Sequence, residues 1–197
     1  MMRALLSLFL LSVAISASAQ NAEELNKHRQ QYKADLAKDI KADTAKVDFY
    51  PFNPELIITA TVEELKDQPT FEMITSSGMK KEAQKFVKVT FNYKNENYTL
   101  FGYQLTKLKE NKELADHFFI PFKDVTTGKT TYASGRYLDF KAGDIKDGKL
   151  VIDFNKAYNP YCAFTDGYNC PIPPKENTLK LAVQAGEKKY RGEKLTR

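Results

Sequence analysis

The sequence predicts a mainly β protein, in which a single antiparallel sheet curls into a sandwich or an open barrel of about eight strands behind one N-terminal amphipathic helix. Two observations predict this fold. After residue 49, apolar and polar residues alternate in short runs, and turns separate these runs instead of the helical crossovers that parallel strands require. Before residue 45 the apolar residues recur at helical spacing instead.

The helix is expected over residues 21–44, where neither glycine nor proline occurs. Asn21 stands before two glutamates and would suit a helix N-terminus, because acids in the first turn face the positive end of the helix dipole. The apolar positions form a narrow stripe: Leu25, Tyr32, Leu36 and Ile40.

The β-rich body is expected over residues 49–189, with a hairpin turn at residues 95–97. The basic tail after Gly186 is expected to be loose at its end. Alternating or densely apolar runs mark the candidate strands, which are residues 56–62, 71–75, 87–93, 98–106, 117–122, 130–132, 136–140, 150–154 and 179–183.

Composition points to an ordinary globular protein. Hydrophobic residues make up 42% of the 197 positions and charged residues 28%. The formal net charge is +5, and the two signs are interspersed, so a nucleic-acid partner is not expected. This length favours one domain, over residues 20–197, and we expect a monomer.

Residues 1–19 have the pattern of a signal peptide. Arg3 supplies a positive start, Leu5–Ile15 is a short apolar block, and Ala17–Ala19 offers small residues to signal peptidase. The apolar block is about half as long as a membrane span requires. We therefore expect cleavage after Ala19 and a soluble exported protein, periplasmic or secreted, without a membrane span.

The stretch from Asp153 to Asn177 holds both cysteines and four of the eight prolines. In an exported protein, the pair Cys162 and Cys170 favours a structural disulfide over a redox pair, which usually has two residues between its cysteines. Closing so short a loop is worth roughly 2.5 kcal/mol. Because the prolines also fix φ, this stretch is expected to be a long stapled loop.

Motifs for several reaction classes are absent from the sequence. It has no phosphate-binding glycine loop, no dinucleotide fingerprint, no zinc-protease motif and no nucleophile elbow. His28 and His117 are the only histidines, and the cysteine pair has no histidine nearby to complete a zinc site. No metal and no cofactor are expected.

Polar residues in and near the stapled loop allow two interpretations. In the first, Asp153 and Glu176 bind ligand hydroxyls or exchange protons. Arg136 then binds an anion, between stacking walls formed by Tyr132, Tyr137 and Tyr158. In the second, the amides and carboxylates only cap turns and satisfy the loop backbone. The candidate ligand-binding residues are Arg136, Tyr137, Asp153, Asn155, Tyr158, Asn159, Glu176 and Asn177.

Several blocks of the sequence also carry a resemblance to a known family. They are Gly135–Leu138 (GRYL), Asp153–Pro160 (DFNKAYNP), Cys162–Phe164 (CAF), Cys170–Pro174 (CPIPP) and Glu176–Asn177 (EN). In this order they resemble a bacterial domain of unknown function of the DUF1684 type. The resemblance runs from about Phe49 to Lys189. It implies a single domain but no activity, substrate or catalytic residue.

Three functions stay open at the level of the sequence. The protein could be a binding module for a small ligand or an envelope component. It could be a metal-independent hydrolase using Asp153 or Glu176 with Arg136. It could also be a structural envelope protein without a small-molecule site. Convergence of these three residues on an open concavity would favour a binder or an enzyme, and full burial and pairing would favour a structural role.

Overall fold

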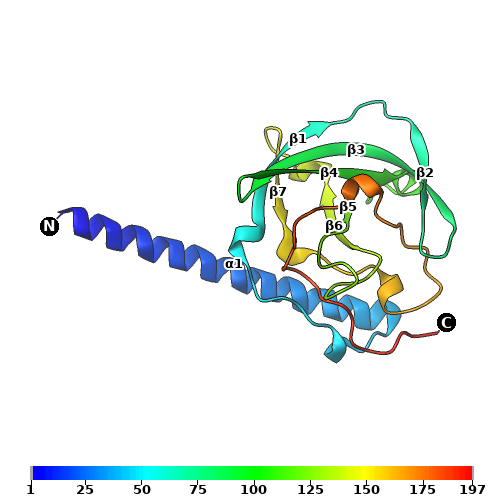
Figure 1. The fold of residues 1–197 in the computed structure, drawn as a ribbon, viewed down its shortest axis with the longest axis horizontal. Helices are drawn as coiled ribbons and strands as arrows, with labels where there is room; N and C mark the ends of the chain where they lie inside the picture. The colour runs from blue at the N-terminus through cyan, green and yellow to red at the C-terminus, as the bar shows by residue number, and fades with distance from the viewer. Residues whose placement is uncertain (1, 197) are drawn as a thin grey trace.

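The computed structural model describes residues 2–196, with side chains described for residues 20–196. Within this part of the chain, one long helix precedes seven strands that form a single antiparallel sheet (Figure 1). The sheet curls into a half-barrel. The expected mainly β fold with an N-terminal helix is therefore confirmed.

The elements are α1 (Met2–Ile40), β1 (Ile57–Glu64), β2 (Thr70–Ile74), β3 (Lys80–Tyr93), β4 (Glu96–Leu105), β5 (His117–Phe122), β6 (Arg136–Lys141) and β7 (Lys149–Asp153). Four short 3-10 helices also matter for the site: η4 (Ala142–Asp144), η5 (Phe154–Lys156), η6 (Tyr161–Ala163) and η7 (Lys175–Asn177).

Hydrogen bonding places the strands in the order β6-β5-β4-β3-β1-β7, and β2 pairs with β3 beside this path. Strands β6 and β7 are therefore the two ends of the curled sheet, although η4 and a short turn connect them in sequence. The β3–β4 hairpin turns at Lys94 and Asn95, both with positive φ, as a two-residue turn that matches strand twist requires.

The sheet has two apolar faces, and a β-bulge lets β3 contribute to both. It lies in β3 between Lys85 and Val87. Because a bulge adds one residue to one strand, it reverses which residues face each side. Ala83, before the bulge, belongs to an outer cluster with Met73, Tyr103, Phe119 and Tyr137. Val87 and Val89, after it, belong to the larger cluster inside the half-barrel.

The inner cluster provides most of the core. Phe118, Ile120 and Phe122 of β5 all point into it and are fully buried. The carboxyl-terminal part of the chain fills the open side of the half-barrel with Leu179, Val183 and Ala185. Burying each large apolar side chain contributes about 1.5–3 kcal/mol, so this cluster dominates the stability of the sheet.

Two of the expected strands are wrong, because the described residues 130–132 and 179–183 form no strand. Around the first, the Thr126 carbonyl accepts hydrogen bonds from the N–H groups of Lys129, Thr130 and Thr131, which makes a turn. In the second, backbone pairing gives way to side-chain bonds: the Leu179 N–H donates to the Lys123 carbonyl at 2.8 Å, whereas the Val183 N–H donates to Asp124 Oδ2 at 2.7 Å.

Helix α1 differs from the expected helix at both ends. It runs continuously from Met2 through the expected start at Asn21, and no glycine or proline interrupts residues 2–20. It ends at Ile40 instead of residue 44, because Lys41 adopts the left-handed conformation with φ of 56°.

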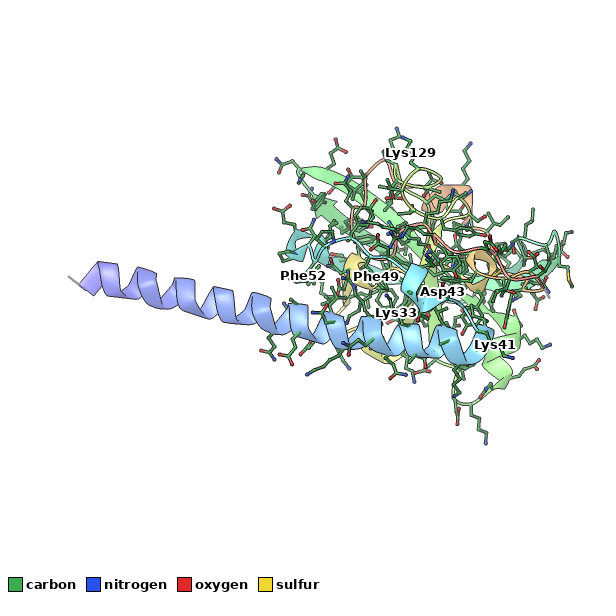
Figure 2. All side chains as sticks on the ribbon, turned by 90° about the horizontal axis from the view of Figure 1, so that it is seen from below. Lys33, Lys41, Asp43, Phe49, Phe52 and Lys129 are labelled. Carbon is green, nitrogen blue, oxygen red and sulfur yellow. A yellow bond between two sulfur atoms is a disulfide. The ribbon has the colours of Figure 1, made fainter. Side chains whose placement is uncertain are left out.

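The second half of α1 packs across the body, while its N-terminal part extends away from it (Figure 1). Leu36 and Ile40 are buried against Phe164 and Tyr190. Figure 2 shows Lys33 and Phe49 beside each other at this junction, and the Lys33 ammonium lies 5.8 Å from the Phe49 ring centre.

The expected signal peptide spans residues 1–19. Met1 and the side chains of residues 2–19 lie outside the part of the chain that the structure describes, and no observation tests the expected cleavage. Among the described residues, no helix is long and apolar enough to cross a membrane.

Candidate functional site

Arg136 opens β6 and is 1% exposed. Its Nη1 donates to the carbonyl oxygens of Ala185 and Glu187, and its Nη2 donates to the Val183 carbonyl at 2.9 Å. Nη2 also lies 3.6 Å from Asp124 Oδ2. Arg136 therefore fastens the carboxyl-terminal segment to the sheet, and its two terminal nitrogens are occupied by the protein.

The candidate asparagines also bind the chain itself. Asn177 Nδ2 donates to the carbonyls of Phe101 at 2.8 Å and Pro121 at 2.7 Å, and Asn177 Oδ1 accepts from the Phe101 N–H. Asn155 exchanges two hydrogen bonds with the backbone of Asn53 in the same manner. These buried amides satisfy the backbone of irregular segments, as the second interpretation of the loop requires.

Glu176 lies on the outer face of the sheet. Its Oε1 is 3.1 Å from both the Tyr103 hydroxyl and the Lys85 ammonium. Burial opposes ionisation of Glu176, but its own backbone N–H and Lys85 outweigh burial and lower its pKa. Arg136 is enclosed in the core and Glu176 is held by other partners, so the proposed hydrolytic set of Asp153, Arg136 and Glu176 does not converge.

The stapled loop is present, with a disulfide between Cys162 and Cys170. Backbone hydrogen bonds dock it onto the β2–β3 hairpin: the Ser76 N–H donates to the Cys170 carbonyl, and the Ile172 N–H to the Ile74 carbonyl, both at 2.8 Å. The loop therefore has a fixed position beside the sheet.

A cavity of about 980 Å³ lies between α1, the two end strands β6 and β7, and the stapled loop. The helix forms its roof through a row from Asn21 to Asp35, and the strands and the loop form its floor and walls. Three of the candidate residues line this cavity: Tyr137, Asp153 and Tyr158.

Three tyrosine rings meet at one corner of the cavity, Tyr137 and Tyr158 from the floor and Tyr32 from the roof. Tyr158 lies 5.9 Å from both Tyr32 and Tyr137 between ring centres, with interplanar angles of 55° and 82°. The Tyr137 hydroxyl donates to the Pro171 carbonyl, and that of Tyr32 to Glu187 Oε2 at 2.7 Å. Burial raises the pKa of all three phenols, so the rings stay neutral and fixed in place.

Asp139 lies beside these rings and was not predicted from the sequence. Its Oδ2 accepts a hydrogen bond from the Tyr158 hydroxyl at 2.7 Å, and its Oδ1 is 3.2 Å from His117 Nε2. Its side chain is 45% exposed, so the carboxylate also faces the cavity. Alternation could have revealed it, because Tyr137 and Asp139 share one face of β6.

Asp153 lies at the end of β7 on the cavity wall. Its Oδ1 accepts from the N–H of Asn155 at 3.0 Å and from Asn155 Nδ2 at 2.9 Å. Its Oδ2 is 4.0 Å from the Lys156 ammonium. Asp153 thus caps the 3-10 helix η5, and only part of its carboxylate remains available to the cavity.

Glu187 lies beneath the roof and is fully buried. Its Oε2 accepts from the Tyr32 hydroxyl and from the Asn159 N–H, both at 2.7 Å. Burial raises the pKa of Glu187 to about 8, against the opposing effect of these hydrogen bonds. The acid is therefore largely protonated at neutral pH, and it joins α1 to the body through Tyr32.

Gly186 makes the buried position of Glu187 possible. Its φ is 75°, and a Cβ there would lie 2.5 Å from the Ala157 carbonyl oxygen, so only glycine fits. The start of the basic tail is consequently packed, and Tyr190 is also buried. No composition or spacing signal in the tail indicated a buried carboxylic acid.

Among the described residues, no group of three or more histidine, cysteine, aspartate or glutamate side chains is arranged to hold a metal ion. The polar side chains that line the cavity are mainly tyrosines, carboxylates and three lysines, with His28 on the roof.

Comparisons with known proteins place the chain in a group without an assigned activity. The family model described as "Protein of unknown function (DUF1684)" matches residues 43–188. Among solved structures, the chain is similar to an uncharacterised protein from Haloarcula marismortui determined by solution NMR. The TM-score is 0.63 at 25% identity, over 86% of this chain and 96% of that chain. No curated protein matches.

Proposed function

We propose that this chain, which belongs to the DUF1684 family of proteins of unknown function, binds a small organic ligand in the cavity between α1 and the sheet. The observation that carries the proposal is the cavity itself. Its volume of about 980 Å³ lies in the range of small-molecule sites, which is roughly 300–1,000 Å³.

The lining supports binding rather than a purely structural role. The rings of Tyr32, Tyr137 and Tyr158 are held by hydrogen bonds from their hydroxyls, so the surface does not have to become ordered when a ligand arrives. Asp139 adds a carboxylate that is half-exposed and therefore accessible from the cavity. Such a prearranged surface of apolar and polar groups is typical of ligand sites.

Hydrolysis has weaker support. The hydrolytic set expected from the sequence needs Asp153 or Glu176 and Arg136 within reach of one substrate, and Arg136 is enclosed in the core. Glu176 lies outside the cavity lining, and the acid with the raised pKa, Glu187, is covered by Tyr32. The binding module is therefore the function that the geometry favours.

We also propose that the protein acts outside the cytoplasm. The disulfide between Cys162 and Cys170 supports this location, because such bonds persist in oxidising compartments. Fractionation of the cells followed by N-terminal sequencing tests the proposal. Export predicts a mature chain that begins at Gln20, and an intact Met1 in the cytoplasmic fraction would contradict it.

Binding can be tested with a designed obstruction of the cavity. Gly143 lines the cavity on η4, has no positive φ, and would leave its Cβ with no heavy atom within 4 Å. Gly143→Phe should therefore fold while filling part of the space, and Gly143→Ala is the matched control.

The full chain and both variants would be screened by thermal shift and by NMR titration against a defined panel of saccharides, carboxylates, amines, amino acids and inorganic phosphate. We expect saturable binding of at least one class, lost in Gly143→Phe and retained in Gly143→Ala. Binding that survives Gly143→Phe unchanged, or no saturable binding by any class, would reject the cavity as the site.

A further inference from the structure

The charge of the cavity is opposite to that of the protein. Five carboxylates and three lysines line it, which gives a net charge of −2 in a chain whose formal charge is +5. His28 adds no charge at neutral pH, because burial lowers its pKa. The carboxylates are those of Glu24, Asp35, Asp139, Asp144 and Asp153. The lysines are Lys81, Lys146 and Lys156.

The lysines offset this charge only in part. The Lys156 ammonium lies 4.0 Å from Asp153 Oδ2, so these two lining charges form one pair. Burial lowers the pKa of Lys81, with the Lys107 charge as a second cause. An anionic ligand would therefore meet an excess of carboxylates, and a cation would meet an attractive field.

The tyrosine hydroxyls add acceptors rather than donors. A phenol has a single proton to donate. Those of Tyr32, Tyr137 and Tyr158 are already used inside the protein. At the rim, the Tyr161 hydroxyl donates in the same way to Asp39 Oδ2 at 2.9 Å. What these four residues still present is ring surface and oxygen lone pairs, which suit a cation or an N–H group.

The orientation of the tyrosine rings also favours a cationic ligand. Tyr158 is nearly perpendicular to Tyr137 and tilted from Tyr32, so the three rings form a corner of aromatic surfaces rather than a flat stack. Corners of this kind bind ammonium groups through the ring quadrupole, with a strength of about 0.5–2 kcal/mol per ring contact. Asp139, bonded to the Tyr158 hydroxyl, supplies a negative charge at the same corner.

We propose that the cavity selects an organic cation, an amine or a quaternary ammonium compound, whose positive charge lies at the corner formed by Asp139, Tyr158 and Tyr32. This inference rests on the proposed function, since it names the ligand class for the same cavity. Asp139 provides the counter-charge and the tyrosines provide the apolar contact.

The test compares three probes of one shape. Choline carries a trimethylammonium group, 3,3-dimethylbutan-1-ol is its neutral isostere, and 3,3-dimethylbutanoate is an anion of similar size. Each is titrated into the full chain at low ionic strength and followed by NMR. We expect saturable binding of choline, binding of the neutral alcohol at least tenfold weaker, and no measurable binding of the anion.

Asp139→Asn then removes the charge while it keeps an acceptor for Tyr158. We expect choline affinity to fall at least fivefold and the affinity of the neutral alcohol to stay the same. Asp67→Asn is the control: it makes the same charge change in an exposed turn outside the cavity lining, where φ of 53° suits asparagine. It should leave both affinities unchanged.

Two results overturn the inference. Equal affinity for choline and its neutral isostere would show that charge is not selected, and so would unchanged choline affinity in Asp139→Asn. If a compound of another charge class binds and Gly143→Phe abolishes that binding, the cavity stays a ligand site and only the cation inference fails. If the whole panel fails, the proposed function fails with it.

Discussion

Strand β6 borders two polar regions that are built in opposite ways. On the inner side, the terminal nitrogens of Arg136 donate to three carbonyl oxygens and approach Asp124, with no access to solvent. On the other side, Asp139 and Tyr158 bond to each other and still face a cavity. We refer to the first region as the polar core and to the second as the cavity corner.

The difference shows that the role of a charged side chain can be inferred from the groups that it contacts. A buried charge that meets only groups of its own chain holds segments together, because losing a partner leaves an uncompensated charge. A charge that keeps part of its surface free can serve a ligand as well. Arg136 and Asp139 stand three residues apart, and alternation along the strand sends them to opposite faces.

The largest expected effect is in the polar core. Arg136→Leu leaves three carbonyl oxygens without their donor and Asp124 without its counter-charge, so we expect the free energy of unfolding to fall by about 3–5 kcal/mol. Urea denaturation measures the change. Arg191→Leu, on the exposed tail, is the control and should change stability by less than about 0.5 kcal/mol. Similar losses in both variants would remove the distinction between the two regions.

Substitution of Glu187 tests the contact between the β-rich body and α1. Because its pKa in the folded state is raised to about 8, the folded chain binds the proton more tightly than the unfolded chain does. The stabilising contribution of this proton is complete below the unfolded pKa near 4.5 and is lost as pH rises through about 8.

In the wild-type chain, the free energy of unfolding should therefore fall by a few kcal/mol between these pH values. Glu187→Gln should abolish this fall. Thermal unfolding across this range provides the measurement, with Glu193→Gln at an exposed position as the control. A wild-type slope that persists in Glu187→Gln would assign the pH dependence to another group.

Loss of the disulfide should act on the cavity wall and leave the polar core intact. Cys162→Ala with Cys170→Ala is expected to cost roughly 2.5 kcal/mol, from the entropy of the short loop that the bond closes. Hydrogen exchange should accelerate in residues 161–171, while the amide of Val183 stays protected. Equal acceleration at Val183 would show that the two regions unfold together.

The smallest effect is expected at the cavity corner. Tyr158→Phe keeps the ring and removes one hydrogen bond to Asp139, so stability should fall by about 1 kcal/mol. The matched control, Tyr98→Phe, removes an exposed hydroxyl bonded to Glu96, and we expect no measurable change in Tm. A loss of several kcal/mol at Tyr158 would make it a structural residue of the same kind as Arg136.

Alternation was sufficient to predict most of the sheet. The run at residues 117–122 coincides with β5. The expected strand at 136–140 differs from β6 by one residue at its end, and the expected strand at 150–154 differs from β7 by one residue at each end. The run at 179–183 alternates equally well but forms no strand. Its first residues bond to the backbone of residues 123–125, whereas the side chains of Asp124 and Arg136 bind the backbone groups of Val183. Side-chain capture of this kind leaves no local pattern.

The site was harder to predict, because its parts come from distant segments. Tyr137, Asp153 and Tyr158 were expected together from the loop and its neighbours. Glu187 stands in a basic tail that reads as solvated, and its burial depends on Gly186 and on a tyrosine of α1 more than 150 positions away. The separation of Arg136 from Asp139 likewise depends on which face of β6 becomes the core.

The roof and the floor of the cavity belong to different parts of the chain. The family model matches residues 43–188 and so contains the floor strands, Tyr158 and Glu187, whereas α1 precedes the match. The cavity is thus built from two modules that are joined by Tyr32, by Arg29 and by the apolar stripe of α1. Grafting another helix that preserves these contacts would exchange the roof without altering the register of any strand, which makes α1 the natural segment for re-engineering selectivity.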